Sequence, residues 1–282
     1  MPNWNSNNLT VKGDPKDVLL FIEENFMTRE NPYSSYKGTY DYVLDFEKIH
    51  PTPTKVNGDI IDEWYEWRNS NWGCKWAPSF EQCNSLTFIL NGKEDESIIK
   101  TYYNNRGKNS NIFDENMIVK YKKMYETDDN PEVYDEAELS TFFETPWCPP
   151  EGMIVFWSER YKNTSLEFRC SYYEPGMCFA GEYRINCKDD DERIVDDCYT
   201  LNNPVEYKTY ILDEGWENLE YIQEDLLELL KDLNPDMDEK MLDLLNNKVK
   251  ETLENAENNK QRALLICDIE ERWRDNRKLS SK

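Results

Sequence analysis

The chain has 282 residues, of which 38% are hydrophobic and 13% aromatic, including 9 Trp, 18 Tyr and 11 Phe. This supply of large apolar side chains excludes a wholly disordered protein. The 57 acidic and 33 basic residues give a formal net charge of −24. That charge excludes unaided binding to nucleic acid or to an anionic membrane surface, because both need clustered Lys and Arg.

The first residues, MPNWNSNNLTVKG, lack the basic and apolar regions of a signal peptide, and no apolar stretch is long enough to span a bilayer. We therefore expect a cytoplasmic protein whose 8 cysteines stay reduced. Their spacings match no common zinc module, so no metal or other cofactor is predicted, although a zinc site or a redox pair stays open. The single histidine, His50, precedes a proline, and we interpret it as the end of a strand rather than as a catalytic base.

Hydrophobic periodicity predicts the elements of the N-terminal part. A strand is expected at 7–12, followed by a helix that has Asp14 as its N-cap and Pro15 at its first position. After this helix we expect a polar loop at 28–37, a strand at 40–46, a helix at 59–69, a tight loop through NWGCKW and a strand at 86–90.

The run at 91–136 is rich in Asn, Lys, Asp and Tyr, and we interpret it as an insertion that carries one helix at 116–125. Beyond it, the patterns predict a strand at 139–143, a helix at 153–161, a hairpin of 166–173 and 179–186, an acidic loop at 188–197 and an edge strand at 207–212.

From Trp216 onward Gly and Pro nearly vanish, and leucines recur at helical spacing as far as Asn234-Pro235. A second, more polar helix is then expected to run with few interruptions to about residue 278, with Asp236 or Asp238 as its cap. We therefore predict an α+β domain at 1–213, including the insertion, and an acidic helical domain at 214–282.

Four segments resemble motifs of one family in the order expected for it: MPNWNSNNLTVKGDP, WRNSNWGCKW (67–76), FFETPWCPPEG (142–152) and EPGMCFAGEY. The family is the YubB-like, ferredoxin-like domain family of phages, plasmids and other mobile elements; Cys74 replaces its Thr. The resemblance covers roughly residues 1–90 and 138–187. It implies an antiparallel β-α-β-β-α-β sheet with helices on one face and no iron–sulfur cluster, and it transfers no catalytic residue.

The tryptophan-rich motifs allow two interpretations. They form either a structural aromatic core or an aromatic-lined pocket for a base or another small ligand. The residues expected to line such a pocket are Trp72, Lys75, Trp76, Glu144 and Trp147. Lys75 would make a cation–π contact or pair with Glu144. The sharp turn expected at Asn71-Trp72-Gly73 needs its glycine.

No P-loop, GxGxxG, HExxH or GxSxG motif occurs, so the chain is predicted not to be an enzyme. Residues 213–257 contain 15 acids and 4 lysines. Such acid density either serves solubility alone or provides an electrostatic partner for a basic surface. The residues expected to contact a partner are Glu217, Glu220, Glu224, Asp225, Glu228 and Asp232.

The combined expectation is a non-enzymatic protein of a phage or mobile element that inhibits a host antiphage defence complex in the bacterial cytoplasm. It would act in the manner of anti-CRISPR or anti-Gabija proteins, by contacting a nuclease or nucleic-acid-binding protein where DNA would otherwise bind. The alternatives are a small-ligand-binding or enzymatic module that uses the tryptophan motifs, and an accessory protein of plasmid or phage maintenance or replication. Long polar helices also favour a homo-oligomer.

Overall fold

In the computed structural model of the chain, the described residues are 3–30, 40–56, 59–60, 63–78, 86–90, 93–94, 136–188, 194–235 and 237–280. The chain divides into two compact units. The first combines Met1–Gly176 with Glu182–Asp197, and the second combines Met177–Gly181 with Cys198–Lys282. The expected boundary at 213/214 therefore lies inside the second unit.

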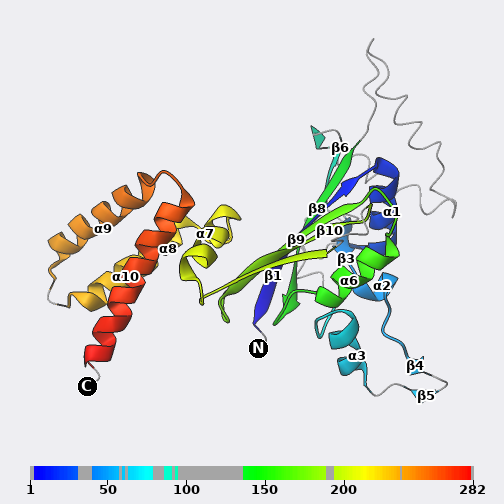
Figure 1. Ribbon diagram of the computed structural model, residues 1–282, viewed down its shortest axis with the longest axis horizontal. Helices are drawn as coiled ribbons and strands as arrows, with labels where there is room; N and C mark the ends of the chain where they lie inside the picture. The colour runs from blue at the N-terminus through cyan, green and yellow to red at the C-terminus, as the bar shows by residue number, and fades with distance from the viewer. Residues whose placement is uncertain are drawn as a thin grey trace, which may run out of the picture. The chain divides into compact units, whose positions relative to one another are not determined.

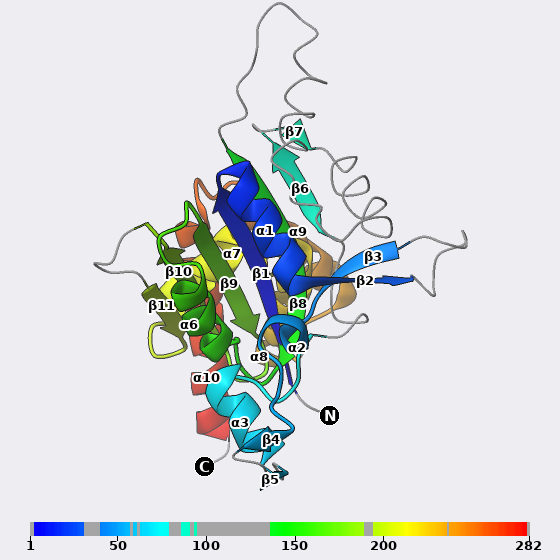
Figure 2. The same ribbon diagram turned by 90° about the vertical axis from the view of Figure 1, so that its right-hand side faces the viewer.

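The first unit is built on an antiparallel sheet in which the first strand of the chain is central. Strand β1 (Trp4–Gly13) pairs with β8 (Ala137–Pro146) on one side and with β9 (Glu167–Glu174) on the other. The seven-stranded sheet has the order β11-β10-β9-β1-β8-β6-β7 (Figure 1 and Figure 2). The remaining strands are β6 (Thr87–Leu90), β7 (Lys93–Glu94), β10 (Phe179–Asn186) and β11 (Ile194–Thr200).

Two helices follow strands of this sheet and cover one of its faces. Helix α1 (Pro15–Asn25) follows β1, and α6 (Glu151–Arg160) follows β8; both lie over the same face of the sheet in Figure 2. Strands β1, β6, β8 and β9 with these helices give the β-α-β-β-α-β arrangement in the spatial order β9-β1-β8-β6. The predicted ferredoxin-like α+β fold is confirmed.

The core lies between that sheet face and the two helices. Side chains alternate along β1 and β8, so that every second residue is buried. The ring of Phe21 on α1 contacts Trp157 on α6 at 5.5 Å and Phe168 on β9 at 5.2 Å, measured between ring centroids. Edge-to-face contacts therefore join α1 to α6 and to the sheet, and Trp157 of α6 stacks on Phe168 of β9 with a centroid distance of 6.1 Å.

Smaller elements occupy the chain between α1 and β6. They are β2 (Phe26–Glu30) paired with β3 (Tyr40–Leu44), α2 (Phe46–Ile49), β4 (Lys55–Val56) paired with β5 (Asp59–Ile60), and α3 (Trp64–Asn71). The loop expected at 28–37 is wrong for residues 28–30, which belong to β2; 31–37 lie outside the described residues. The helix expected from residue 59 begins only at Trp64, and His50 caps α2 rather than ending a strand.

The insertion expected at 91–136 lies outside the described residues, apart from β7 and residue 136. The same holds for the helix expected at 116–125. Beyond it, the hairpin of β9 and β10 is confirmed. The acidic loop expected at 188–197 is wrong from residue 194, where β11 begins.

The second unit contains α7 (Pro204–Asp213), α8 (Leu219–Leu233), α9 (Glu239–Glu254) and α10 (Asn259–Ser280). Its core is an aliphatic cluster made by Leu212, Ile222, Leu226, Val249, Leu253, Ile266 and Ile269. The Asp238 carboxylate caps α9 by accepting a hydrogen bond from the backbone N–H of Met241 at 2.8 Å. The helical segment expected after Asn234-Pro235, with few interruptions, is interrupted at 255–258 and forms α9 and α10.

The edge strand expected at 207–212 is wrong, because these residues form most of α7. Pro204 occupies the first turn of this helix, where its missing N–H has no cost. Tyr207 and Ile211 are both buried at the i, i+4 spacing of one helix face. In the described part of the chain, no helix combines the length and the apolar character needed to cross a membrane.

Candidate functional site

The tryptophan motif at 67–76 brings the end of α3 against the start of α6. Gly73 has φ = +79°, a conformation that L side chains rarely adopt, and a Cβ atom there would lie 2.6 Å from the backbone N of Glu151. A Cβ atom on Gly152 would lie 2.5 Å from the carbonyl O of Asn71. The two glycines therefore allow the two backbones to touch, and the predicted need for glycine at residue 73 is confirmed.

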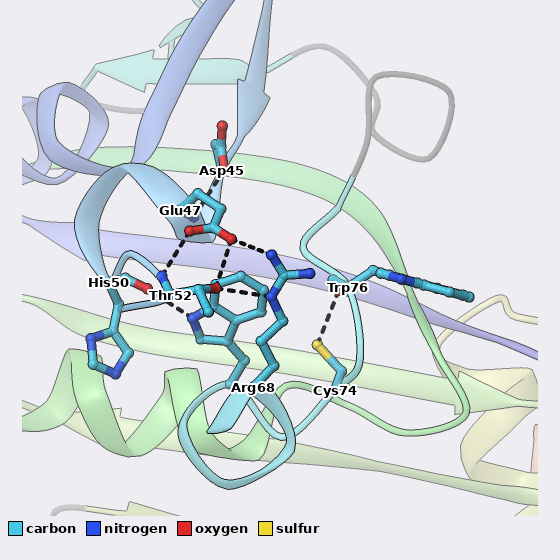
Figure 3. Close-up of polar contacts among 8 residues, drawn as sticks. Asp45, Glu47, His50, Thr52, Arg68, Cys74 and Trp76 are labelled. Atoms are coloured by element: carbon cyan, nitrogen blue, oxygen red, sulfur yellow. Dashed lines mark hydrogen bonds and ion pairs between the residues drawn. The ribbon is translucent and has the colours of Figure 1, made fainter. Parts of the chain in front are cut away.

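Arg68 holds α3 to the segment that follows α2. Its guanidinium carbon lies 5.1 Å from the ring centroid of Trp64 and 4.7 Å from that of Trp72. Its Nε donates to Thr52 Oγ1 at 2.9 Å, and its Nη2 donates to the carboxylate of Glu47 (Figure 3). Thr52 also donates to that carboxylate, from its backbone N–H and from its hydroxyl, at 2.7 Å each. Burial disfavours the charged form of Glu47, but the Thr52 hydrogen bonds and the Arg68 charge lower its pKa.

Trp72, the first residue of the expected pocket, belongs to the core. Its side chain has no exposed surface, and its indole N–H donates to the carbonyl O of His50 at 2.9 Å. Its ring packs edge-to-face against Phe46, which in turn contacts Phe143 of β8. A residue enclosed in this way has no surface with which to line an open pocket.

Of the other four residues of the expected pocket, Lys75 and Trp76 make the expected cation–π contact. Lys75 places its Nζ 4.4 Å from the ring centroid of Trp76, and Trp76 and Trp147 are 37% and 47% exposed. Glu144 alternates along β8 with buried residues, so it points away from the sheet face on which Trp72 packs; partial burial raises the pKa of its carboxyl. Within the described ranges, no ion pair joins Lys75 to Glu144.

The six acidic residues expected to contact a partner lie on α8 or just before it. Glu217 is partly buried, with its carboxylate 3.8 Å from the ammonium of Lys208. The other five are exposed and form what we call the acidic face of α8: Glu220, Glu224, Asp225, Glu228 and Asp232. The opposite side of the helix carries the core residues Ile222 and Leu226. The helix thus separates carboxylates from aliphatic side chains.

A cavity of about 550 Å³, called here the His50 cavity, lies where α3 ends beside α6. The His50 ring forms one wall; it stacks on Phe156 with a centroid distance of 4.2 Å and lies 5.0 Å from the Trp67 ring. Burial lowers the pKa of His50, and its contact with Asn71 opposes that change. The lining residues are His50, Asn69, Ser70, Asn71, Gly73, Glu151, Gly152, Val155, Phe156 and Glu159.

A second cavity, of about 310 Å³, lies on the strands β1, β9, β10 and β11. It contains three basic side chains, each paired with a carboxylate. Lys12 lies 2.9 Å from Glu138, Arg169 lies 2.5 Å from Glu182, and Arg184 pairs with both Glu182 and Asp197. Because these charges are already matched, the cavity offers an incoming anion little net attraction.

The described cysteines are candidates for two roles, as disulfide partners and as metal ligands. None of the seven described cysteines is joined in a disulfide. In the same residues, no group of three or more His, Cys, Asp or Glu side chains is placed to hold a metal ion. Burial raises the pKa of the Cys170 thiol to about 12 and also raises that of Cys148.

Residues 120–203 match the model of a protein family described as the ferredoxin-like domain in Api92-like protein. The chain carries a ferredoxin-like domain. The matched range begins inside the expected insertion, includes the strands from β8 to β11 and ends just before α7. No curated protein and no solved structure matched the chain.

The sequence does not predict the His50 cavity, although Asn71, Gly73 and Gly152 belong to motifs noted above. His50 was interpreted as a strand end because it precedes a proline. A signal was nevertheless present in α6, where Glu151, Val155 and Glu159 recur at i, i+4 and i+8 and therefore share one face. The pairing of that face with the end of α3 depends on the fold, which the spacing alone does not give.

Proposed function

We propose that the chain is a non-enzymatic binding protein whose acidic face of α8 docks on a basic surface of a partner protein. The observation that carries this proposal is the exposure of five carboxylates along one side of a single helix. Helix α8 contributes one base, Lys231, to offset them. Their mutual repulsion is relieved when a basic partner surface lies against them.

The partner class follows from the form of the acidic face. Carboxylates at i, i+4 and i+8 recur about every 6 Å along a helix, because each residue adds 1.5 Å. A nucleic acid strand likewise carries a regular row of negative charges, which proteins neutralise with Lys and Arg. A groove lined with Lys and Arg for DNA is therefore the kind of surface we propose, and the host partner is a nuclease or another nucleic-acid-binding protein.

The biological setting that we propose is a phage or another mobile element. The resemblance of residues 1–90 and 138–187 to the YubB-like family supports a source in a phage or another mobile element. A protein of such an element that occupies a nuclease groove inhibits antiphage defence, in the manner of anti-CRISPR or anti-Gabija proteins.

The test uses two full-length variants with the same loss of charge. The first neutralises the acidic face of α8 (E220Q/E224Q/E228Q), and the second neutralises three exposed acids at the end of α9 and just beyond it (E251Q/E254Q/E257Q). Each is expressed in bacterial hosts with and without a nuclease-based defence system, and the plating efficiency of a restricted phage is measured. We expect the wild type and the α9 variant to restore plating, and the α8 variant to lose at least tenfold of that effect.

Two results would oppose the proposal. Equal loss in both variants would mean that total charge matters and the α8 face does not. Absence of any effect of the wild type across hosts with nuclease-type defences would remove the anti-defence role, and it would favour an accessory role in maintenance or replication of the element. A small-ligand module built on the tryptophan motifs has less support, because Trp72 is fully buried and Glu144 lies on the other face of β8.

A further inference from the structure

Two cysteines that are distant in the sequence meet where the loop after α3 touches the segment before α6. The thiol of Cys148 donates to the carbonyl O of Gly73 at 2.9 Å, and Cys74 follows Gly73 directly. A carbonyl O lies about 3 Å from the Cα atom of the next residue, so the Cys148 sulfur lies within about 6 Å of the Cys74 Cα atom. Burial raises the pKa of the Cys74 thiol, and the neighbouring Cys148 thiol raises it further, which requires the two sulfurs to be close.

The backbones that carry these two thiols are held in place. Gly73 packs directly against the backbone at the start of α6. Trp147, which precedes Cys148, has φ = +73° and donates its backbone N–H to the carbonyl O of Asn3 at 2.9 Å. The hydroxyl of Thr145 donates to the carbonyl O of Cys148 at 2.7 Å. Because the fold has already brought the two segments together, a bond between the thiols needs side-chain rotation and little further ordering of the chain.

The two thiols differ in their access to solvent. Cys74 has no exposed surface, whereas Cys148 is half-buried, so a dissolved oxidant reaches Cys148 first. Burial also raises the pKa of Cys148, and the carboxylate of Glu151 adds to that rise. Since the thiolate is the reactive form, the pair stays reduced under mild conditions and responds to strong oxidation.

We propose that Cys74 and Cys148 form a redox-sensitive pair, which hydrogen peroxide converts to a disulfide that locks the loop after α3 to the segment before α6. Peroxide first oxidises the Cys148 thiol to a sulfenic acid and is itself reduced to water. The Cys74 sulfur then attacks the Cys148 sulfur, the S–O bond breaks, and the Cys74 proton leaves with the hydroxyl group as a second water.

The new bond closes a loop of the chain that includes β6, β7 and β8. It therefore restricts the unfolded chain and stabilises the first unit when the protein is oxidised. This inference does not depend on the proposed function, since neither cysteine lies on α8.

The test treats the reduced full-length protein with hydrogen peroxide at about pH 8, where more of the thiol is ionised than at neutral pH. Remaining thiols are blocked with N-ethylmaleimide after unfolding, and mass spectrometry of unreduced peptides measures how much Cys148 is linked to Cys74. We expect this link to be the main disulfide of the folded protein. Its yield should fall about fivefold or more when the chain is oxidised in guanidinium, because the fold then no longer brings the two thiols together.

The locking effect has its own measurement. The oxidised protein should unfold about 5 °C or more above the reduced protein, and dithiothreitol should reverse that shift. C148S should abolish both the link and the shift, whereas C74S should leave Cys148 as a sulfenic acid that dimedone traps. C198S is the matched control, since it removes an exposed cysteine outside the pair, and it should change neither result.

Four results would each overturn the proposal. They are the absence of the link after peroxide treatment, a link from Cys148 mainly to another cysteine, a yield no higher in the folded than in the unfolded chain, and the same thermal shift in C148S as in the wild type.

Discussion

Asn25 at the end of α1 accepts a hydrogen bond from the indole N–H of Trp157 on α6, 132 residues further along the chain, at 2.9 Å. The same carboxamide donates to the hydroxyl of Tyr161 at 2.7 Å. All three residues are almost fully buried. One amide thus satisfies two aromatic side chains in the core and fixes α1 against α6.

Replacing Asn25 by Ala should destabilise the first unit by about 2–4 kcal/mol, because it leaves the buried Trp157 N–H without an acceptor and removes the bond to Tyr161. Urea unfolding followed by tryptophan fluorescence measures the change. Asn69→Ala is the matched control, since its carboxamide is exposed and bonds the Tyr65 carbonyl O; it should cost about 0.5 kcal/mol or less. A loss of similar size in both variants would contradict this account.

Gly73→Ala should destabilise by about 3 kcal/mol or more, since it combines a left-handed conformation with a Cβ atom 2.6 Å from a backbone nitrogen. Gly215 provides the comparison. Its φ is +69°, but a Cβ there meets nothing within 4 Å, so Gly215→Ala should cost only about 1 kcal/mol. Thermal unfolding of both variants gives the difference, which isolates the effect of the α3–α6 contact. If the two changes cost the same, crowding at Gly73 has no effect.

His50 should make the stability of the first unit depend on pH between about 5 and 7.5. Its pKa is lowered in the folded state, so the unfolded chain binds the proton more readily. The contribution of His50 is therefore fully present above its unfolded pKa, and it is lost as the pH falls through the folded value. The difference in unfolding free energy between the wild type and His50→Gln should shrink as the pH falls from 7.5 to 5. Its growth over that range would show that the pKa is raised instead.

The pair of Glu47 and Arg68 should show strong coupling in a double-mutant cycle with E47Q and R68M. Both side chains are partly buried, and Thr52 joins them, so we expect a coupling energy of about 1–2 kcal/mol. The control cycle uses Lys250 and Glu254, which are more than half exposed and 4.0 Å apart; about 0.5 kcal/mol or less is expected there. Chemical unfolding of each single and double variant provides the values. Equal coupling in the two cycles would show that the network around Arg68 adds nothing to an ordinary surface pair.

The sequence predicted the elements whose periodicity is decided by a buried face. The stripe of Val18, Phe21 and Ile22 on α1 is one case, and the alternation along β8 is another. The sequence did not predict the strand whose pairing depends on main-chain hydrogen bonds and not on a pattern of buried side chains. The polar residues 28–30 carry no strand pattern, yet they pair with β3 through main-chain hydrogen bonds.

Helix α7 shows the opposite failure. Its residues 207–212, YKTYIL, are rich in strand-forming types, but their burial on one helix face overrides that preference. The candidate site was missed for a related reason. The tryptophan motifs can be read directly in the sequence. The cavity instead is lined by His50, by the end of α3 and by the face of α6 that carries Glu151, Val155 and Glu159. These segments are distant in sequence, so only the fold brings them together.

The position of β1 in the sheet has a consequence for synthesis on the ribosome. This strand is translated before the other strands of the sheet, and its pairing partners β8 and β9 begin only at residues 137 and 167. At 5–20 residues per second, the nascent strand waits roughly 7–30 s for its first neighbour. After Trp4, its first half carries three Asn and one Ser side chain, which tolerate water during this delay. Those that later become buried, Asn5 and Asn7, bond to each other at 2.7 Å once the sheet closes.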